Sequence, residues 1–217
     1  MNIGGNIMVN LNDISEALQR GKADKVSELV KQALEENLLP KDILENGLIK
    51  GMDIIGAKFK KNEVYVPEVL IAARAMHAGM NILQPKLTET GVKKIGTVAI
   101  GTVKGDLHDI GKNLVEMMLE GAGFEVIDLG IDVSVDKFVE SITKYQPNIL
   151  GMSALLTTTM IQMQEVIKAI SDAGLRDKVK IIIGGAPITQ NYADQIGADG
   201  YSPDAASAVD KAKTFIA

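Results

Sequence analysis

The chain has 217 residues, of which 46% are hydrophobic and 24% are charged, and its formal net charge at pH 7 is −5. This length suffices for one or two domains with buried cores, and the acidic balance argues against a general nucleic-acid binder, which normally displays a basic surface. The absence of cysteine excludes disulfides, thiolate metal sites and cysteine nucleophiles. It also fits a reducing compartment, so we expect a cytoplasmic protein.

The N-terminal part of the chain has the pattern of a helical domain. Residues 1–10 have neither the charge nor the apolar core of a signal peptide, and we expect a loose tail there. Apolar residues at three- and four-residue spacing then predict a small antiparallel four-helix bundle over residues 11–84. Residues 85–94 are polar, include a Pro and a Gly, and are predicted to be a linker. No stretch of the chain is long and apolar enough to predict a membrane segment.

From residue 95 the pattern changes to short apolar runs that alternate with amphipathic helices. Strands are predicted at 95–102, 124–130, 148–155, 180–185 and 198–202. Helices are predicted at 110–121, 135–145, 159–173, 189–196 and 204–216. Continuous Ile/Val runs bounded by Gly indicate a parallel sheet covered on both faces. Residues 95–217 are therefore predicted to form an α/β doubly wound, five-stranded, Rossmann-like or flavodoxin-like domain with strand order 2-1-3-4-5.

Three polar or glycine-rich segments follow strands that are neighbours in this order. They are "GDLHDIGKN" (105–113), "SALLTTT" (153–159) and "GGAP" (184–187), after the first, third and fourth strands. In an open α/β sheet, ligands bind beyond the carboxyl ends of the strands, where the strand order reverses. We therefore expect the three segments to converge on one binding site.

His108 is one of only two histidines in the chain, and its residue context leaves several interpretations open. The simplest is a loop histidine at the start of the following helix. A zinc site is disfavoured because zinc normally takes three or four protein ligands. The patterns G-x-S-x-G of many hydrolases and G-x-G-x-x-G of dinucleotide sites are absent from the segment after the first strand. A lone imidazole also suits an axial ligand to a metal in a macrocycle, with Asp106 as the acceptor for the other ring nitrogen.

The three segments together resemble a known signature. Asp106-x-His108-x-x-Gly111, then Ser153-x-Leu155, then Gly184-Gly185 resemble the cobalamin-binding motif of methionine synthase and the corrinoid methyl-carrier proteins. The stretch "GMDIIGAKFKKNEVYVPEVLIAARAM" (51–76) is similar to the family's helical cap domain. The resemblance covers roughly residues 11–217, and it implies a cap domain at 11–84 and a cobalamin-binding domain at 95–217.

The resemblance implies a role for individual residues. His108 would be the metal ligand, as the lower axial ligand to cobalt in base-off cobalamin, which would cycle between methylcobalamin and cob(I)alamin, and His108 would leave the metal in the cob(I)alamin state. Asp106 would accept a hydrogen bond from His108, and Thr159 would complete this relay where the family has a Ser. The remaining residues that would line the cofactor are Gly105, Leu107, Asp109, Ile110, Gly111, Ser153, Leu155, Thr157, Gly184, Gly185 and Ala205 in the α/β domain, and Glu45, Phe59 and Val66 in the cap. Phe59 and Val66 are alternatively interpreted as bundle core.

The resemblance also implies a function. It is that of a corrinoid protein which carries a methyl group from a substrate-specific methyltransferase to a second methyltransferase that serves tetrahydrofolate or coenzyme M, with a reductive activase as a further partner. The donors left open are methanol, methylamines, glycine betaine and aryl methyl ethers. Two alternatives are a cobalamin-dependent sensor and the B12-binding subunit of a carbon-skeleton mutase. The lack of Trp argues against the sensor, and the cap against the mutase.

Overall fold

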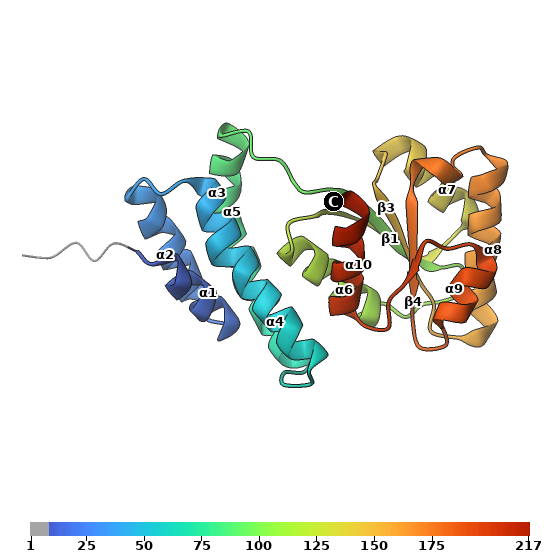
Figure 1. Ribbon diagram of the computed structural model, residues 1–217, viewed down its shortest axis with the longest axis horizontal. Coiled ribbons are helices and arrows are strands. Elements are labelled where there is room, and N and C mark those ends of the chain that lie inside the picture. Colours follow the sequence, from blue (N-terminus) through green and yellow to red (C-terminus); the bar gives the residue numbers. More distant parts are fainter. Residues whose placement is uncertain (1–8) are drawn as a thin grey trace, which may run out of the picture. The chain divides into compact units, whose positions relative to one another are not determined.

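The computed structural model describes residues 9–217, which form two compact units that divide between Lys93 and Lys94 (Figure 1). Of the predicted tail at 1–10, residues 1–8 lie outside the described residues. Asn10 belongs to the fold, because its side chain caps the first helix by accepting a hydrogen bond from the Asn12 N–H.

The first unit is helical. Its elements are α1 (Leu11–Gln19), α2 (Ala23–Glu35), α3 (Pro40–Asp42), η1 (Ile43–Ile49), α4 (Lys50–Lys60) and α5 (Val66–Glu89). The elements α3, η1 and α4 follow one another without a break, so this unit has the four helical segments that the periodicity predicts. The stretch η1 is π-helical, which widens the helix locally and is frequent at functional sites. The unit's core contains the fully buried side chains Ile14, Leu18, Val26, Val30, Ile43, Leu48, Val69 and Leu83.

The structure differs from the predicted linker at 85–94 in one respect. Helix α5 continues through Pro85 to Glu89, so half of that segment is helical. Pro normally breaks a helix because it removes one hydrogen bond of the ladder. Here Leu87, in the next turn, is buried at 3% exposure, and this packing favours continuation of the helix.

The second unit is an α/β sandwich around a parallel sheet. Its strands are β1 (Thr97–Val103), β2 (Glu125–Val133), β3 (Ile149–Ser153), β4 (Lys180–Gly184) and β5 (Gly200–Tyr201). All neighbouring pairs are parallel, and the order β2-β1-β3-β4-β5 confirms the predicted topology. The helical elements are α6 (Ile110–Gly121), α7 (Val135–Tyr145), α8 (Thr157–Asp172), η2 (Arg176–Lys178), α9 (Gln190–Ile196) and α10 (Ala205–Ile216).

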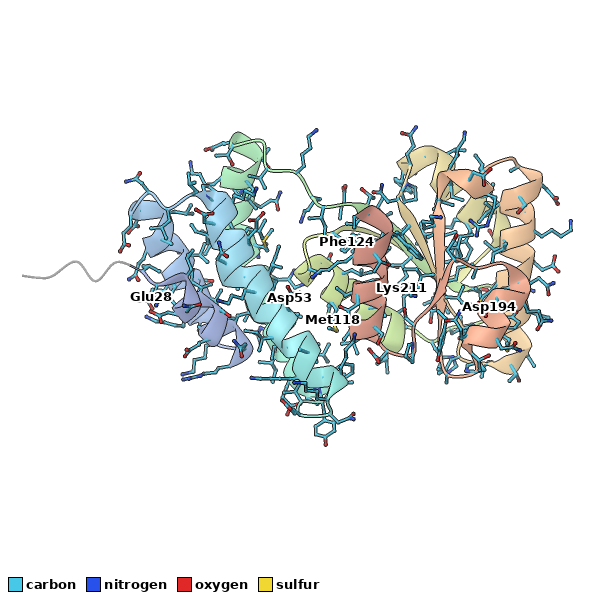
Figure 2. All side chains as sticks on the ribbon, in the orientation of Figure 1. Glu28, Asp53, Met118, Phe124, Asp194 and Lys211 are labelled. Atoms are coloured by element: carbon cyan, nitrogen blue, oxygen red, sulfur yellow. The ribbon has the colours of Figure 1, made fainter. Side chains whose placement is uncertain are left out.

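Helices cover both faces of this sheet, with α6 and α10 on one face and α7, α8 and α9 on the other (Figure 1). Met118 of α6 and Phe124, labelled in Figure 2, are buried in this unit. Leu150 of β3 and Met163 of α8 belong to the core under the opposite helices. Burial on both faces explains why the strands read as continuous apolar runs. Within residues 9–217, no helix is both long and apolar enough to cross a membrane.

Candidate functional site

The loops that follow β1, β3 and β4 leave the same edge of the sheet, because these strands are parallel neighbours. Two hydrogen bonds join the loops. The Ala154 N–H, just after β3, donates to the Gly184 carbonyl at 3.2 Å. The Leu155 N–H donates to Oδ2 of Asp106 at 2.7 Å. The three segments singled out in the sequence therefore meet at this edge.

Asp106 is the centre of this arrangement. Its side chain is fully buried, and both of its oxygens accept hydrogen bonds. Oδ1 accepts from Nδ1 of His108 at 2.7 Å and from the His108 main-chain N–H at 3.1 Å. Oδ2 accepts from the Thr159 hydroxyl at 2.7 Å as well as from Leu155. Thr159 lies in the first turn of α8 and is itself 7% exposed. A chain of hydrogen bonds therefore connects Thr159, Asp106 and the imidazole of His108.

These contacts keep the buried carboxyl group ionised. Burial on its own raises the pKa of a carboxyl group, because desolvation disfavours the charged form. At this site the hydrogen bonds from Leu155, Thr159 and His108 outweigh that effect and hold the pKa of Asp106 well below its ordinary value. The imidazole of His108 therefore faces a carboxylate, which fixes its ring and stabilises a proton on Nδ1.

His108 itself is accessible. Its side chain is 51% exposed, and because Nδ1 bonds to Asp106, Nε2 is the nitrogen left to bind another group. The N-cap position of α6 is Asp109, which makes no side-chain capping bond. The His108 ring bonds through Nδ1 to Asp106. Leu107 and Ile110, on either side, are 67% and 77% exposed. Apolar side chains exposed together beside an imidazole are typical of a surface that an apolar group covers.

Glycines allow close approach to the backbone at this edge. Gly105 and Gly185 adopt φ values of +81° and +127°, which other residues rarely take. A Cβ on Gly185 would lie 1.8 Å from the Ala154 carbonyl oxygen, and one on Gly184 would lie 3.1 Å from the Ser202 carbonyl oxygen. Around Gly111 a Cβ would meet nothing within 4 Å.

Ser202 adds an unsatisfied polar group beside this edge. Its side chain is 5% exposed, and its Oγ has no hydrogen-bond partner in the part of the chain that the structure describes. A buried hydroxyl without a partner is costly, which favours an additional ligand group at this place. Ser202 is not among the site residues predicted from the sequence.

The other predicted residues of the α/β unit lie at element ends near this edge. Ser153 is the half-buried last residue of β3, and Thr157 is the exposed first residue of α8. Leu155, between them, is 42% exposed. Ala205 is the buried first residue of α10, which follows β5.

The predicted cap residues lie in the helical unit. Glu45 is exposed in η1, with a carboxylate oxygen 3.7 Å from Nζ of Lys41. Phe59, near the end of α4, and Val66, the first residue of α5, are half-buried. Neither is among the fully buried residues of the bundle, so each keeps a part of its surface accessible.

Two further residues contact the loop and were not predicted. The Thr102 hydroxyl donates to the His108 carbonyl at 2.8 Å, and Oδ1 of Asp132 accepts from the Gly105 N–H at 2.7 Å. Thr102 is the last residue of the apolar run 95–102, and nothing in that run indicates that its hydroxyl contacts the loop. Asp132 faces the loop because of an irregularity in β2, for which the sequence carries no signal.

Comparisons with known proteins give this site its context. A family described as "B12 binding domain" matches residues 96–210, and a second family of the same description matches residues 11–84. The chain is 46% identical over 209 residues to dimethylamine corrinoid protein 1 of Methanosarcina mazei, with 95% of each chain covered. It is 42% identical to the trimethylamine corrinoid protein of Methanosarcina barkeri, over 93% of this chain and 94% of the relative. The chain belongs to the corrinoid protein family.

Two solved structures agree with this assignment. A cobalamin-binding protein from Desulfitobacterium hafniense superposes with a TM-score of 0.82 at 32% identity, covering 97% of this chain and all (100%) of that one. The methanol:cobalamin methyltransferase complex MtaBC of Methanosarcina barkeri contains a chain that superposes with a TM-score of 0.84 at 31% identity, covering 95% of this chain and 79% of that one.

The residues present fit a corrinoid. Within residues 9–217 there is no cluster of three or more His, Asp or Glu side chains that could hold a metal ion. A corrinoid needs no such cluster, because the macrocycle supplies most of the ligands and the protein adds an axial one. A large, mostly apolar cofactor with polar substituents suits this site. The site offers the exposed His108 with its apolar neighbours, glycine backbone and the unpartnered Ser202 hydroxyl.

Proposed function

We propose that this corrinoid protein carries a methyl group on cobalamin between two methyltransferases. The first would be specific for the methylated substrate, and the second would serve tetrahydrofolate or coenzyme M. The observation that carries the proposal is the chain of hydrogen bonds from Thr159 through Asp106 to an exposed His108, inside a B12-binding domain. When bound, cobalamin supplies a cobalt atom that accepts and releases the methyl group.

In this proposal Nε2 of His108 would bind the cobalt of the corrinoid. Asp106 fixes the ring by accepting a hydrogen bond from Nδ1–H, which makes Nε2 the lone-pair nitrogen. The ionised Asp106 would hold the Nδ1 proton of His108 whether or not Nε2 binds the metal. Thr159 and the Leu155 N–H keep the carboxylate in place during both states.

The remaining loops would hold the rest of the cofactor. Leu107 and Ile110 offer exposed apolar contacts for the macrocycle, and Ser202, beside Gly184, offers a hydroxyl for its nucleotide tail, with Gly184 and Gly185 as predicted lining residues. In the helical unit Glu45, Phe59 and Val66 stay the predicted contacts to the upper face, next to the methyl group. Their accessibility supports this role.

We propose a methylamine as the methyl donor. The two compared relatives at 42–46% identity are corrinoid proteins named for dimethylamine and trimethylamine, whereas the chain from the methanol system is 31% identical. The presence of a relative in a complex with a methyltransferase supports a methyltransferase as the first partner. A reductive activase stays a predicted third partner, and the cytoplasm the predicted compartment.

Reconstitution followed by a transfer assay tests this function. The protein is loaded with cobalamin, mixed with a methylamine:corrinoid methyltransferase and a coenzyme M or tetrahydrofolate methyltransferase, and the methylated acceptor is measured. We expect transfer from dimethylamine or trimethylamine, its loss in His108→Ala, and its retention in His77→Gln, because His77 is exposed in the helical unit. Transfer from no methylated amine would contradict the proposed donor, and transfer from no methylated substrate to either acceptor would contradict the carrier role. Failure to bind cobalamin would contradict the whole proposal.

A further inference from the structure

We propose that Thr102 and Asp132 are positioning residues that hold the two ends of the loop 105–108 and thereby place the imidazole of His108. Both act through main-chain hydrogen bonds of the loop rather than through its side chains. The inference rests on the proposed role of His108 as the cobalt ligand, and it adds two residues that the sequence motif does not contain.

Thr102 holds the far end of the loop. It lies near the end of β1, is completely buried, and its Oγ1 donates to the His108 carbonyl at 2.8 Å. His108 is therefore held at three points, because its N–H and its ring both bond to Asp106. The Thr102 bond is the one among these that fixes the main chain of His108 to the sheet.

Asp132 holds the near end of the loop. Its Oδ1 accepts from the Gly105 N–H at 2.7 Å, and its own N–H donates to the Asp106 carbonyl at 3.1 Å. These two hydrogen bonds bracket the peptide group between Gly105 and Asp106. The orientation of that peptide group determines the direction in which the Asp106 side chain leaves the main chain.

An irregularity in β2 brings Asp132 to this place. The register of β1 and β2 shifts between the pairs Ile100–Asp128 and Val103–Val133, so that β2 contains more residues than its partner there. Asp132 adopts a φ of +51°, which is uncommon for a residue other than Gly. Bulges that re-aim a side chain are over-represented beside functional sites.

The loop is held mainly by hydrogen bonds, those at Thr102 and Asp132 together with those of Asp106, rather than by apolar packing. Leu107, His108 and Asp109 are exposed, so apart from Asp106 the loop buries no large side chain. The pairing of β1 with its neighbours, in which Thr102 lies opposite Ser153, does not require the hydroxyl. Loss of either anchor is therefore expected to disturb the placement of His108 more than the stability of the domain.

Matched variants separate placement from folding. Thr102→Val keeps the shape and removes the donor, whereas Thr102→Ser keeps the donor. Asp132→Gly removes the acceptor at a backbone angle that Gly tolerates, and Asp132→Asn keeps an acceptor oxygen. Each full-length variant is labelled with ¹⁵N-histidine, reconstituted with cob(II)alamin, and studied by electron paramagnetic resonance. A ligated ¹⁵N splits each cobalt line into a doublet, whereas the ¹⁴N of the cofactor's own base gives a triplet.

We expect Thr102→Val and Asp132→Gly to lower the ratio of His-ligated to unligated cobalt about tenfold, the lower end of the usual effect of outer-shell changes at metal sites. Thr102→Ser and Asp132→Asn should restore the wild-type ratio, and cobalamin should stay bound in all four. If one variant does not fold, the pair at the other anchor carries the test. A wild-type doublet that persists undiminished in Thr102→Val and Asp132→Gly would overturn this inference alone. Absence of the doublet from the wild type would overturn it together with the proposed role of His108.

Discussion

The segment 105–113 contains two buried charges of opposite sign, Asp106 and Lys112, and the protein compensates them in different ways. Asp106 is met by neutral donors and by an exposed imidazole. Lys112 is 2% exposed, and its Nζ donates to carboxylate oxygens of both Glu116 and Asp128, the latter at 2.8 Å. The Asn113 side chain accepts a third bond at 2.9 Å.

The difference indicates which charge serves chemistry. One partner of Asp106 is an exposed imidazole whose second ring nitrogen is left to bind a ligand, whereas the two charged partners of Lys112 are carboxylates that neutralise it. Glu116 belongs to α6 and Asp128 to β2, so the Lys112 cluster joins a helix to the edge strand of the sheet. We infer a functional role for the Asp106 network and a structural role for the Lys112 cluster.

Removal of the buried ammonium should have the largest effect on stability. Lys112→Met leaves the largely buried Glu116 and the half-exposed Asp128 without their partner, which should cost about 3 kcal/mol of unfolding free energy, the lower end for breaking a buried ion pair. Urea unfolding of the cobalamin-free protein measures this loss. The folded fraction should still ligate cobalt through His108. Lys168→Met is the control, because Lys168 pairs with Asp172 at 70% and 66% exposure, and exposed pairs contribute about 0–1 kcal/mol. An equal loss of unfolding free energy in both variants would contradict the structural role of the cluster.

Neutralising Asp106 should have a smaller effect on stability and a larger one on ligation. In Asp106→Asn an amide NH₂ replaces one carboxylate oxygen and faces a donor, either at Leu155 and Thr159 or at His108. An unsatisfied buried donor costs about 1–3 kcal/mol. Chemical unfolding gives the stability, and the absorption spectrum of bound cobalamin gives the share with His108 on the metal. A variant that ligates cobalt as the wild type does would show that Asp106 does not orient His108.

The hydroxyl of Thr159 should matter more than its methyl group. Thr159→Val removes the bond to Asp106 and should cost about 1 kcal/mol, the usual value of one hydrogen bond. Thr159→Ser keeps that bond and removes only a methyl group, which lies 3.6 Å from where a Gly105 Cβ would be. We expect the spectrum and melting temperature of the Ser variant to stay close to wild type. If Ser and Val behave alike, the relay does not extend to this residue.

The Lys112 cluster should also produce a modest pH dependence. Burial raises the pKa of Glu116 from 4.5 to about 7, against the opposing effect of Lys112. The native state therefore holds a proton that the unfolded state releases, and the unfolding free energy should fall as pH rises from about 4.5 to about 7. Unfolding curves across this range measure the slope, and Glu116→Gln should flatten it. An unchanged slope in that variant would assign the pH dependence to other groups.

The sequence predicted most of this architecture because the strands are buried on both faces, so their apolar runs are conspicuous. It also indicated that the segments after β1, β3 and β4 meet, since parallel neighbours end at one edge. It did not reveal the burial of Lys112, because Lys is rarely buried. The helical continuation past Pro85 and the placement of Asp132 depend on tertiary packing and on an irregular strand register. Neither leaves a local signal in the chain.

Isotope labelling tests the central claim most directly, because the chain has only two histidines. Cob(II)alamin bound to the ¹⁵N-histidine protein should show the doublet of a ligated ¹⁵N. The doublet should persist in His77→Gln and disappear in His108→Gln. A triplet in the labelled wild-type protein would show that the cofactor's own base ligates the metal, and a doublet that survives in His108→Gln would place the ligand elsewhere. Either result would contradict the account given for Asp106 and His108.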